Sequence, residues 1–307
     1  MTNHAGSRSA CFRTAFLFIR AVAPLCGILF PMPQTSPHNP ITSKDNNIIK
    51  HLRSFADPKY RKKEKSFLIE GVKMVEEALR DNLGVTLLVA APALVQHHGK
   101  GVLKLAENRA VEVLWISDRL MDALAESKTP QPVMAVVKMK EYSEDTLLDH
   151  LNGLIIIAHQ LQDPGNLGTI IRTSEAVGAS GVAITNNTVD PYNDKAIRAS
   201  MGSILRLPVA HIGDGTAFIR MCKERSFQTA ATVLSGERSC FDVDLTKPTV
   251  FILGQEGAGL PQDIIADIDL RIHIPMTDAI DSLNVATAAA VVLYETLRQR
   301  TKGNVPC

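Results

Sequence analysis

The stretch LIIIAHQLQDPGNLGTIIRTSEAVG, residues 154–178, contains a strand, a loop and a helix in succession. Its first five residues are all apolar, which predicts a strand over Leu154–Ala158 that is buried on both faces, as in a parallel sheet. The apolar residues after Asn166 recur at helical spacing, so we expect a helix over Leu167–Val177 that ends at Gly178. Ligands of open α/β sheets bind beyond the carboxyl ends of strands, so the loop of this stretch is a candidate ligand site.

The same alternation of strands and helices continues to the C-terminus. Short apolar runs predict further strands, and amphipathic segments between them predict helices. Such alternation predicts a mainly parallel, doubly wound sheet. The expected strands are Gly181–Thr185, Leu207–His211, Gln228–Val233, Thr249–Leu253 and Arg271–Ile274, and the expected helices cover about 194–201, 215–225 and 283–300.

A second α/β pattern lies upstream, in residues 44–140. Its expected strands are Ser66–Glu70, Val85–Ala90, Val111–Ile116 and Val133–Val137, with helices over Gly71–Arg80 and about 99–108 and 118–125. The acidic segment 141–150 has little apolar pattern and is expected to be a linker. We therefore expect a domain over 44–140 and another over 151–307, as the chain length also favours.

Residues 1–43 differ in composition from the rest of the chain. They contain Arg8, Arg13 and Arg20, whereas the first acidic residue is Asp45. An acid-poor start that bears arginines is typical of a transit peptide, but the apolar runs are too short and interrupted for a membrane span. The polar run after Met32 favours an upstream extension or a disordered tail, with a cytoplasmic location. A cleaved targeting peptide over residues 1–31 stays open as the alternative.

The overall composition, with 45% hydrophobic and 21% charged residues, is ordinary for a soluble globular protein. The formal net charge is +1, so an RNA-binding surface, if present, must be local. The five cysteines form no CxxC pair, which disfavours a zinc site or a disulfide framework, and we expect no metal.

Asn166 and Arg172 are the polar residues of interest in the opening stretch. Asn166 stands where it could cap the helix, which would be a purely structural role. Arg172 points away from the helix face that carries Leu167, Ile170 and Ile171. On its own, this position is more typical of a solvated surface arginine.

Two later segments also follow apolar strands. Residues 253–261, Leu-Gly-Gln-Glu-Gly-Ala-Gly-Leu-Pro, contain three glycines, which suits close backbone approach or positive φ. They match neither GxxxxGK[ST] nor GxGxxG, which disfavours a nucleotide phosphate loop. Glu256 there could be a turn residue, an active-site carboxylate or half of an interface ion pair. The third segment runs from Ile-Pro-Met (274–276) to Ser-Leu-Asn-Val (282–285), and Asp281 or Ser282 could cap the last helix.

In this order and spacing, the three segments resemble the three motifs of the SpoU (TrmH-like) RNA 2′-O-ribose methyltransferases, within the SPOUT class. The run Asn-Leu-Gly-Thr-Ile-Ile-Arg-Thr (166–173) matches the first motif, residues 254–260 the second, and 274–276 with 282–285 the third. Residues 44–140 resemble the substrate-binding domain of many members, through the runs 60–63 and 67–71. Gln255 and Ala286 depart from the common Asn and Ser, which bears on subfamily.

The resemblance implies an α/β fold in which a SPOUT-type trefoil knot, with a mainly parallel sheet, follows a small ribosomal-protein-like α/β domain that binds RNA. It implies S-adenosylmethionine as cofactor, RNA as substrate, with ribosomal RNA favoured over tRNA, and a homodimer through the C-terminal domain. The last helix, apolar nearly all round, fits such a dimer. The implied catalytic residues are Asn166, Arg172, Glu256, Ser282 and Asn284. The implied cofactor contacts are Leu253, Gly254, Gly257, Ile274, Pro275, Met276 and Leu283.

The segment Lys44–Lys65 has eight Lys or Arg and three acids, a net charge of +5. Such a cluster is often a solvated face, but beside a methyltransferase it becomes a candidate for phosphate contacts. The predicted RNA contacts are Lys59, Arg61, Lys62, Lys63 and Arg198, with Arg206 as a further candidate.

Three other functions compete with this interpretation. A relative that acts on tRNA shares all the motifs. A non-catalytic RNA-binding protein is disfavoured because Asn166, Arg172 and Glu256 are all present. A nucleotide-dependent oxidoreductase is disfavoured because the chain lacks GxGxxG and the ribose-binding acid that follows it.

Overall fold

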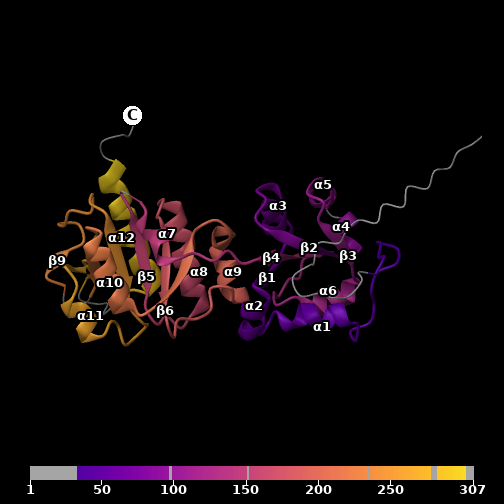
Figure 1. Cartoon of the computed structure of the whole chain (residues 1–307), viewed down its shortest axis with the longest axis horizontal. Helices are drawn as coiled ribbons and strands as arrows, with labels where there is room; N and C mark the ends of the chain where they lie inside the picture. The colour runs from indigo at the N-terminus through magenta and orange to yellow at the C-terminus, as the bar shows by residue number, and fades with distance from the viewer. Residues whose placement is uncertain (1–32, 97–98, 151, 234–235, 278–281, 302–307) are drawn as a thin grey trace, which may run out of the picture.

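The computed structural model describes residues 33–96, 99–150, 152–233, 236–277 and 282–301. Two α/β units, each built around its own sheet, lie side by side along the long axis of the molecule (Figure 1). Most of the predicted N-terminal extension, residues 1–32, lies outside the described residues. No helix in the described parts of the chain is long and apolar enough to cross a membrane.

The C-terminal unit has a seven-stranded sheet in the order β7-β6-β5-β10-β8-β11-β9, and every neighbouring pair of strands is parallel. This confirms the predicted sheet. The strands are β5 (Leu154–Ala158), β6 (Gly181–Thr185), β7 (Val209–Gly213), β8 (Gln228–Thr232), β9 (Arg238–Ser239), β10 (Thr249–Leu253) and β11 (Leu270–His273). Their carboxyl ends all lie at one edge.

Helices cover both faces of this sheet, as the continuous apolar strands require. In β5, Ile155 and Ile157 pack with one layer of helices, and Leu154 and Ile156 pack with the other. The first layer contains α7 (Glu144–Leu148), α10 (Gly215–Glu224) and α11 (Gln262–Ala266). The second contains α8 (Pro164–Ala176), α9 (Asp194–Ser200), the short 3₁₀ helix η1 (Ser203–Leu205) and α12 (Val285–Thr301).

The N-terminal unit is a four-stranded sheet in the order β1-β4-β2-β3. The strands are β1 (Ser66–Glu70), β2 (Val85–Ala90), β3 (Glu112–Trp115) and β4 (Val133–Lys138). One face packs against α3 (Val72–Arg80) and α5 (Lys100–Asn108), and the other against α1 (Asn47–Ser54) and α6 (Asp118–Leu124). The remaining helices are α2 (Pro58–Glu64) and α4 (Ala93–Gln96).

Several segments differ from the prediction, among them the start of β7 and the predicted linker. Strand β7 starts at Val209 instead of Leu207, because Pro208 has no N–H to donate and contributes only its carbonyl, which accepts from Val182 at 2.9 Å. The predicted linker 141–150 contains α7, whose Leu147 and Leu148 are buried in the C-terminal core. This segment is therefore packed onto the C-terminal unit.

Arg61 joins the two units and is not part of an RNA surface. It is 4% exposed, and its guanidinium donates to Asp190 Oδ2 at 2.5 and 3.0 Å and to the carbonyls of Phe55 and Ala56. A buried guanidinium with four such bonds cannot reach a phosphate. We therefore withdraw Arg61 from the predicted RNA-binding residues. The ring of Phe67, 4.6 Å from that of Tyr192, extends this junction.

Replacing Arg61 with Met should destabilise the protein by about 3 kcal/mol, because it leaves Asp190 and two carbonyls without their partner. Urea unfolding measures this change. The matched control is Lys62→Met, which removes an exposed charge from the same helix and should change stability by less than about 0.5 kcal/mol. Equal stability of the two variants would show that the Arg61–Asp190 pair does not hold the units together.

Candidate active site

Three loops open at the carboxyl edge of the seven-stranded sheet. One follows β5 and leads into α8, one follows β10, and one follows β11. Strand β10 pairs with β5 on one side and with β8 on the other, and β8 pairs with β11. The three segments singled out in the sequence therefore start close together, although up to about 120 residues separate them along the chain.

Helix α8 begins at Pro164, three residues earlier than predicted. Asp163 is its N-cap, and Asp163 Oδ1 accepts from the backbone N–H of Asn166 at 2.9 Å. Pro164 occupies the first turn, where a missing N–H costs nothing. The interpretation of Asn166 as the cap is wrong, and its side chain is available for other contacts.

The side-chain amide of Asn166 connects all three loops. Its Nδ2 donates to Glu256 Oε1 at 2.8 Å, and its Oδ1 accepts from Asn284 Nδ2 at 3.0 Å. Asn284 has a fixed orientation because its Oδ1 caps α12, accepting from the N–H groups of Ala286 at 2.9 Å and Thr287 at 3.3 Å. Each amide thus has one orientation in which all these bonds form. We call Asn284, Asn166 and Glu256 the amide chain.

Glu256 ends the amide chain as an ionised carboxylate. Burial raises its pKa, but hydrogen bonds from the Asn166 side chain and from the backbone N–H groups of Glu256, Gln162 and Asp163 outweigh this, so the pKa lies below its ordinary value. Its Oε2 accepts from the Gln162 N–H at 3.2 Å. Such a carboxylate is a poor proton acceptor near neutral pH. It is suited to fixing Asn166.

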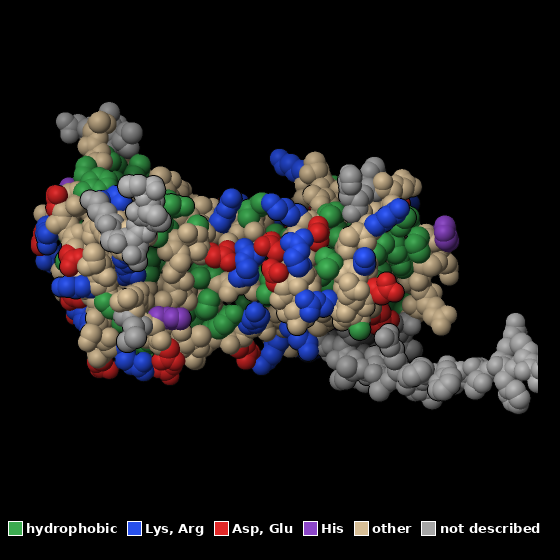
Figure 2. Space-filling model, turned by 90° about the horizontal axis from the view of Figure 1, so that it is seen from above, with side chains coloured by type: hydrophobic (Ala, Val, Ile, Leu, Met, Phe, Trp, Pro, Cys, Tyr) green, Lys and Arg blue, Asp and Glu red, His purple; other side chains and the backbone are tan. Residues whose placement is uncertain are grey.

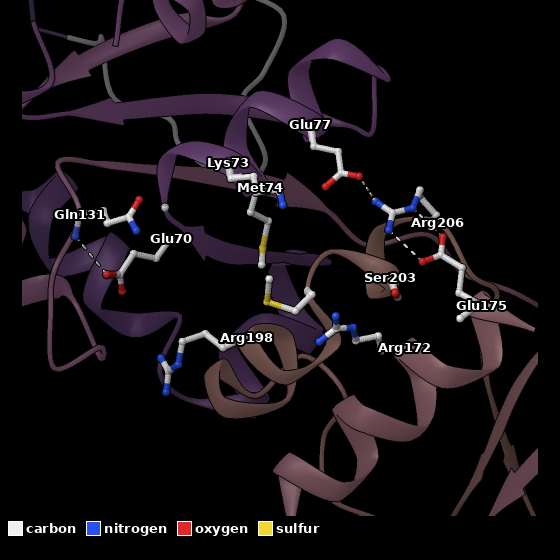
Figure 3. Close-up of a pocket in the computed structure, with 13 residues that line it drawn as sticks. Glu70, Lys73, Met74, Glu77, Gln131, Arg172, Glu175, Arg198, Ser203 and Arg206 are labelled. Atoms are coloured by element: carbon white, nitrogen blue, oxygen red, sulfur yellow. Dashed lines mark hydrogen bonds and ion pairs between the residues drawn. The ribbon is translucent and has the colours of Figure 1, made fainter. Parts of the chain in front are cut away.

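Arg172 and Ser282 do not join the amide chain. Helix α8 carries Arg172 about 9 Å along its axis from Asn166, and the Arg172 side chain lines a groove between the two units (Figure 3). No hydrogen bond or ion pair joins Arg172 to another described residue. Ser282 is exposed, two residues before Asn284 in the chain, and Asp281, the other candidate cap, lies outside the described residues.

The loop after β10 presents its main chain. Gln255 and Gly259 pair with each other at 3.1 and 2.9 Å, which closes the loop tightly. A Cβ at Gly254 would lie 2.5 Å from the carbonyl group of Gly259, so glycine alone fits there. Gly257 and Gly259 have φ of +86° and +70°. The N–H groups of Gly257 and Ala258 bond to no described residue and are open to a ligand.

The chemistry of the loops after β10 and β11 fits a ligand without phosphate. Residues 254–261, 274–277 and 282–284 include no Lys or Arg, so they offer main-chain groups and apolar side chains. Pro275 and Met276 are exposed, and Ile274 and Leu283 are half-buried. Leu253 differs from the prediction. Its side chain is 1% exposed in the core, and we withdraw it as a cofactor contact.

Sequence reasoning missed the residues that shape the loop after β5. Gln160 has a φ of +55°, and its N–H donates to the hydroxyls of Thr185 at 3.2 Å and Thr188 at 3.0 Å. Gln162 Nε2 donates to the carbonyls of Gln160 and Asn187, both at 2.8 Å. These bonds present the Gln162 N–H to Glu256. No composition or spacing signal marks a glutamine with positive φ, so only the structure reveals it.

The remaining residues predicted to contact RNA differ in whether their side chains already form ion pairs. Lys59, Lys62 and Lys63 are exposed on α2. Arg198 forms an ion pair with Asp194 on its own helix. Arg206 is bound by two carboxylates and is not a free cation. Figure 2 shows basic and acidic side chains mixed over the junction of the units.

Two family profiles match the chain. The profile of the SpoU rRNA Methylase family matches residues 153–294, and that of the MRM3-like substrate binding domain matches residues 46–135. Together they cover both structural units. They agree with the resemblance drawn from the motifs.

Similar proteins cover nearly the whole chain. An uncharacterized tRNA/rRNA methyltransferase of Synechocystis is 31% identical over 89% of this chain and 99% of its own. The 23S rRNA (guanosine(2553)-2′-O)-methyltransferase RlmP of Bacillus subtilis is 30% identical over 83% and 97%. The crystal structure of an AdoMet-bound rRNA methyltransferase from Sinorhizobium meliloti is 32% identical, covers 84% of this chain and 97% of its own, and superposes with a TM-score of 0.73.

The amide chain predicts a penalty for a second carboxylate at position 166. Asn166→Asp should be less stable than Asn166→Ala by about 1 kcal/mol at pH 7, because the introduced carboxylate would face the ionised Glu256 in a partly solvated site. One carboxyl of the pair would have a raised pKa in the folded state. The penalty should therefore grow as pH rises above about 4 and shrink below it. Urea unfolding at pH 7 and pH 4.5 measures it, and equal stability of both variants at pH 7 would contradict the geometry.

Proposed function

The chain belongs to the SpoU rRNA methylase family and is an RNA 2′-O-ribose methyltransferase that uses S-adenosylmethionine, and we propose that its substrate is ribosomal RNA. The amide chain supports the methyltransferase activity, because it joins all three family motifs at one sheet edge. The action of the relative RlmP on 23S rRNA supports ribosomal RNA over tRNA.

S-adenosylmethionine, when bound, supplies an activated methyl group on a sulfonium. The open N–H groups and the glycine-rich turn after β10 suit the polar edges of such a ligand. The apolar side chains after β11 suit an adenine ring. The residues that would hold it are Gly254, Gly257, Ile274, Pro275, Met276 and Leu283.

The protein's own residues have to orient a weak nucleophile, the ribose 2′-hydroxyl, and stabilise the charge that develops on it. Asn166 retains one N–H and one lone pair beyond the amide chain, and we assign these groups and the nearby Ser282 and Asn284 to positioning the ribose. Glu256 holds Asn166. We assign Arg172 to the adjoining phosphate, because a guanidinium presents only donors and matches phosphate oxygens.

Replacing Arg172 with Ala should slow methyl transfer about 100-fold, the usual cost of losing a charge-stabilising donor. Single-turnover transfer of a labelled methyl group to unmethylated ribosomal RNA measures the rate. Since Arg172 is exposed and has no partner among the described residues, unfolding stability and S-adenosylmethionine binding should stay at the wild-type level. A variant that methylates at the wild-type rate would remove Arg172 from the site.

The RNA class is tested by mapping ribose methylation in cells with and without the gene. A ribosomal position that loses its methyl group with the gene would support the proposal. Loss confined to tRNA would overturn it and favour the related tRNA activity. We further propose that residues 44–140 bind RNA, that residues 151–307 carry the chemistry, and that the enzyme works in the cytoplasm.

We also propose a homodimer through the C-terminal unit. Helix α12 buries Ala289, Val292 and Leu293, yet its Tyr294 is 53% exposed on the outer face. An exposed tyrosine next to the apolar residues of a helix is typical of an interface anchor. The occupant we expect there is the same helix of a second copy.

Replacing Tyr294 with Glu should turn the dimer into a monomer, because it places a charge without a partner at the centre of the interface. Light scattering after size exclusion measures the mass. The matched control is Val95→Glu, a similarly exposed apolar residue, 43% exposed, on the N-terminal unit. A monomeric wild type, or a dimer that Tyr294→Glu leaves intact, would contradict this interface.

A further inference from the structure

A groove of about 710 Å³ lies between the two units, away from the amide chain (Figure 3). Its N-terminal wall comes from β1, the start of α3 and Gln131, and its C-terminal wall comes from α8, α9 and η1. This volume is within the range of small-molecule sites. The function assigned above to the sheet edge accounts for Arg172 but for no other residue of the groove.

Two cations in the groove have no partner in the described parts of the chain, and they come from different units. Lys73 of α3 and Arg172 of α8 form no hydrogen bond or ion pair with another described residue. Glu77 and Glu175 share Arg206, which also lines the groove. Glu70 accepts from Ser127 and Gln131. The lining has four Lys or Arg and three Glu, a net charge of +1, and Lys73 and Arg172 lie on opposite walls.

The stability of helix α3 does not explain why a lysine stands at position 73. It lies in the first turn of α3, where the helix dipole disfavours a positive charge. A lysine at this position, without an acidic partner among the described residues, costs some helix stability. Such a position is more consistent with a lysine that binds an external anion.

The floor of the groove is apolar. Met74 lies between Lys73 and the two arginines Arg172 and Arg198 (Figure 3), and Met201 lines the same groove. Met201 is 50% exposed and ends α9 with a φ of 49°. Glycine is usual at such a position, and another residue there costs about 1 kcal/mol. Methionine side chains are polarizable and adapt well to the face of an aromatic ring.

The walls of the groove are held in place from both units. Arg206 donates to Glu77 of the N-terminal unit at 2.5 Å and to Glu175 of α8 at 2.6 and 2.8 Å. Helix α9 packs closely on α8 because Gly168 has no side chain: a Cβ there would lie 2.3 Å from the Ala196 carbonyl. This packing fixes α9, which ends at Met201, against α8, which carries Arg172, and both residues line the groove.

We propose that this groove binds a nucleotide of the RNA substrate next to the methylated one, with its phosphate between Lys73 and Arg172 and its base against Met74 and Met201. The inference rests on the proposed function, since it takes RNA as the substrate. The bound phosphate would join Arg172 of the C-terminal unit to Lys73 of the N-terminal unit. The RNA would then cross the junction of the two units, and both units would bind the same strand.

The test of the phosphate contact is the salt dependence of RNA binding by the full-length protein, with a fluorescent oligouridine as the probe. Lys73→Gln should weaken binding by up to about fivefold and make the slope of log affinity against log salt shallower by about 0.7. The matched control is Lys104→Gln, an exposed lysine on α5 outside the groove, which should change neither quantity. An unchanged slope for Lys73→Gln would overturn the phosphate contact.

The test of the base contact is Met201→Asn. Asparagine accepts a positive φ more readily than methionine, so this variant should fold at least as well as the wild type. Affinity should fall a few-fold without a change in the salt slope, because no charge is removed. A 4-thiouridine oligonucleotide should crosslink to peptides that contain Met74 or Met201. Crosslinks confined to α2 and its lysines would overturn the groove as an RNA site.

The two proposals fail separately. If the wild type methylates ribosomal RNA but Lys73→Gln binds with an unchanged slope, the groove inference fails and the enzymatic function stands. If the wild type methylates tRNA alone, the proposed substrate fails, whereas a slope that depends on Lys73 still supports the groove as an RNA site.

Discussion

Asn166 can use both ends of its amide only where a carboxylate and an amide donor meet it from two other loops. The parallel sheet brings these loops to one edge, and β10, between β5 and β8, brings Glu256 next to the start of α8. The start of α12 then fixes the orientation of Asn284, which fixes that of Asn166. The geometry of the site therefore depends on how one helix end satisfies its N–H groups.

Local pattern is enough to predict much of the fold. The buried strands β5 and β10 have their predicted bounds, because a continuous apolar run between turn residues has few alternatives. The prediction misses the start of α8, since the apolar spacing begins only at Leu167, although Asp163-Pro164 is a good start signal. Helices α1 and α2 are missed because the basic charge of their segment dominates over its periodicity.

The residues of the site can be named from the sequence, but their contacts cannot. Asn166 bonds to partners 90 and 118 residues away, and no local signal encodes such a pairing. Arg61 illustrates the same limit, since its role is set by Asp190, 129 residues away. Basic composition predicts a surface from Lys44 to Lys65, whereas the structure uses Arg61 and Arg206 inside the junction and leaves Lys73, outside that segment, without a described partner.

The position of α12 has a consequence for the order in which the enzyme becomes active. Asn284 and α12 come after all the other described strands and helices, and chains fold from the N-terminus as they are synthesised. Strands β5, β8 and β10 can pair earlier, but the Asn166 oxygen lacks the Asn284 donor until the last helix packs against α8. A nascent chain therefore has a folded N-terminal unit before the amide chain is complete.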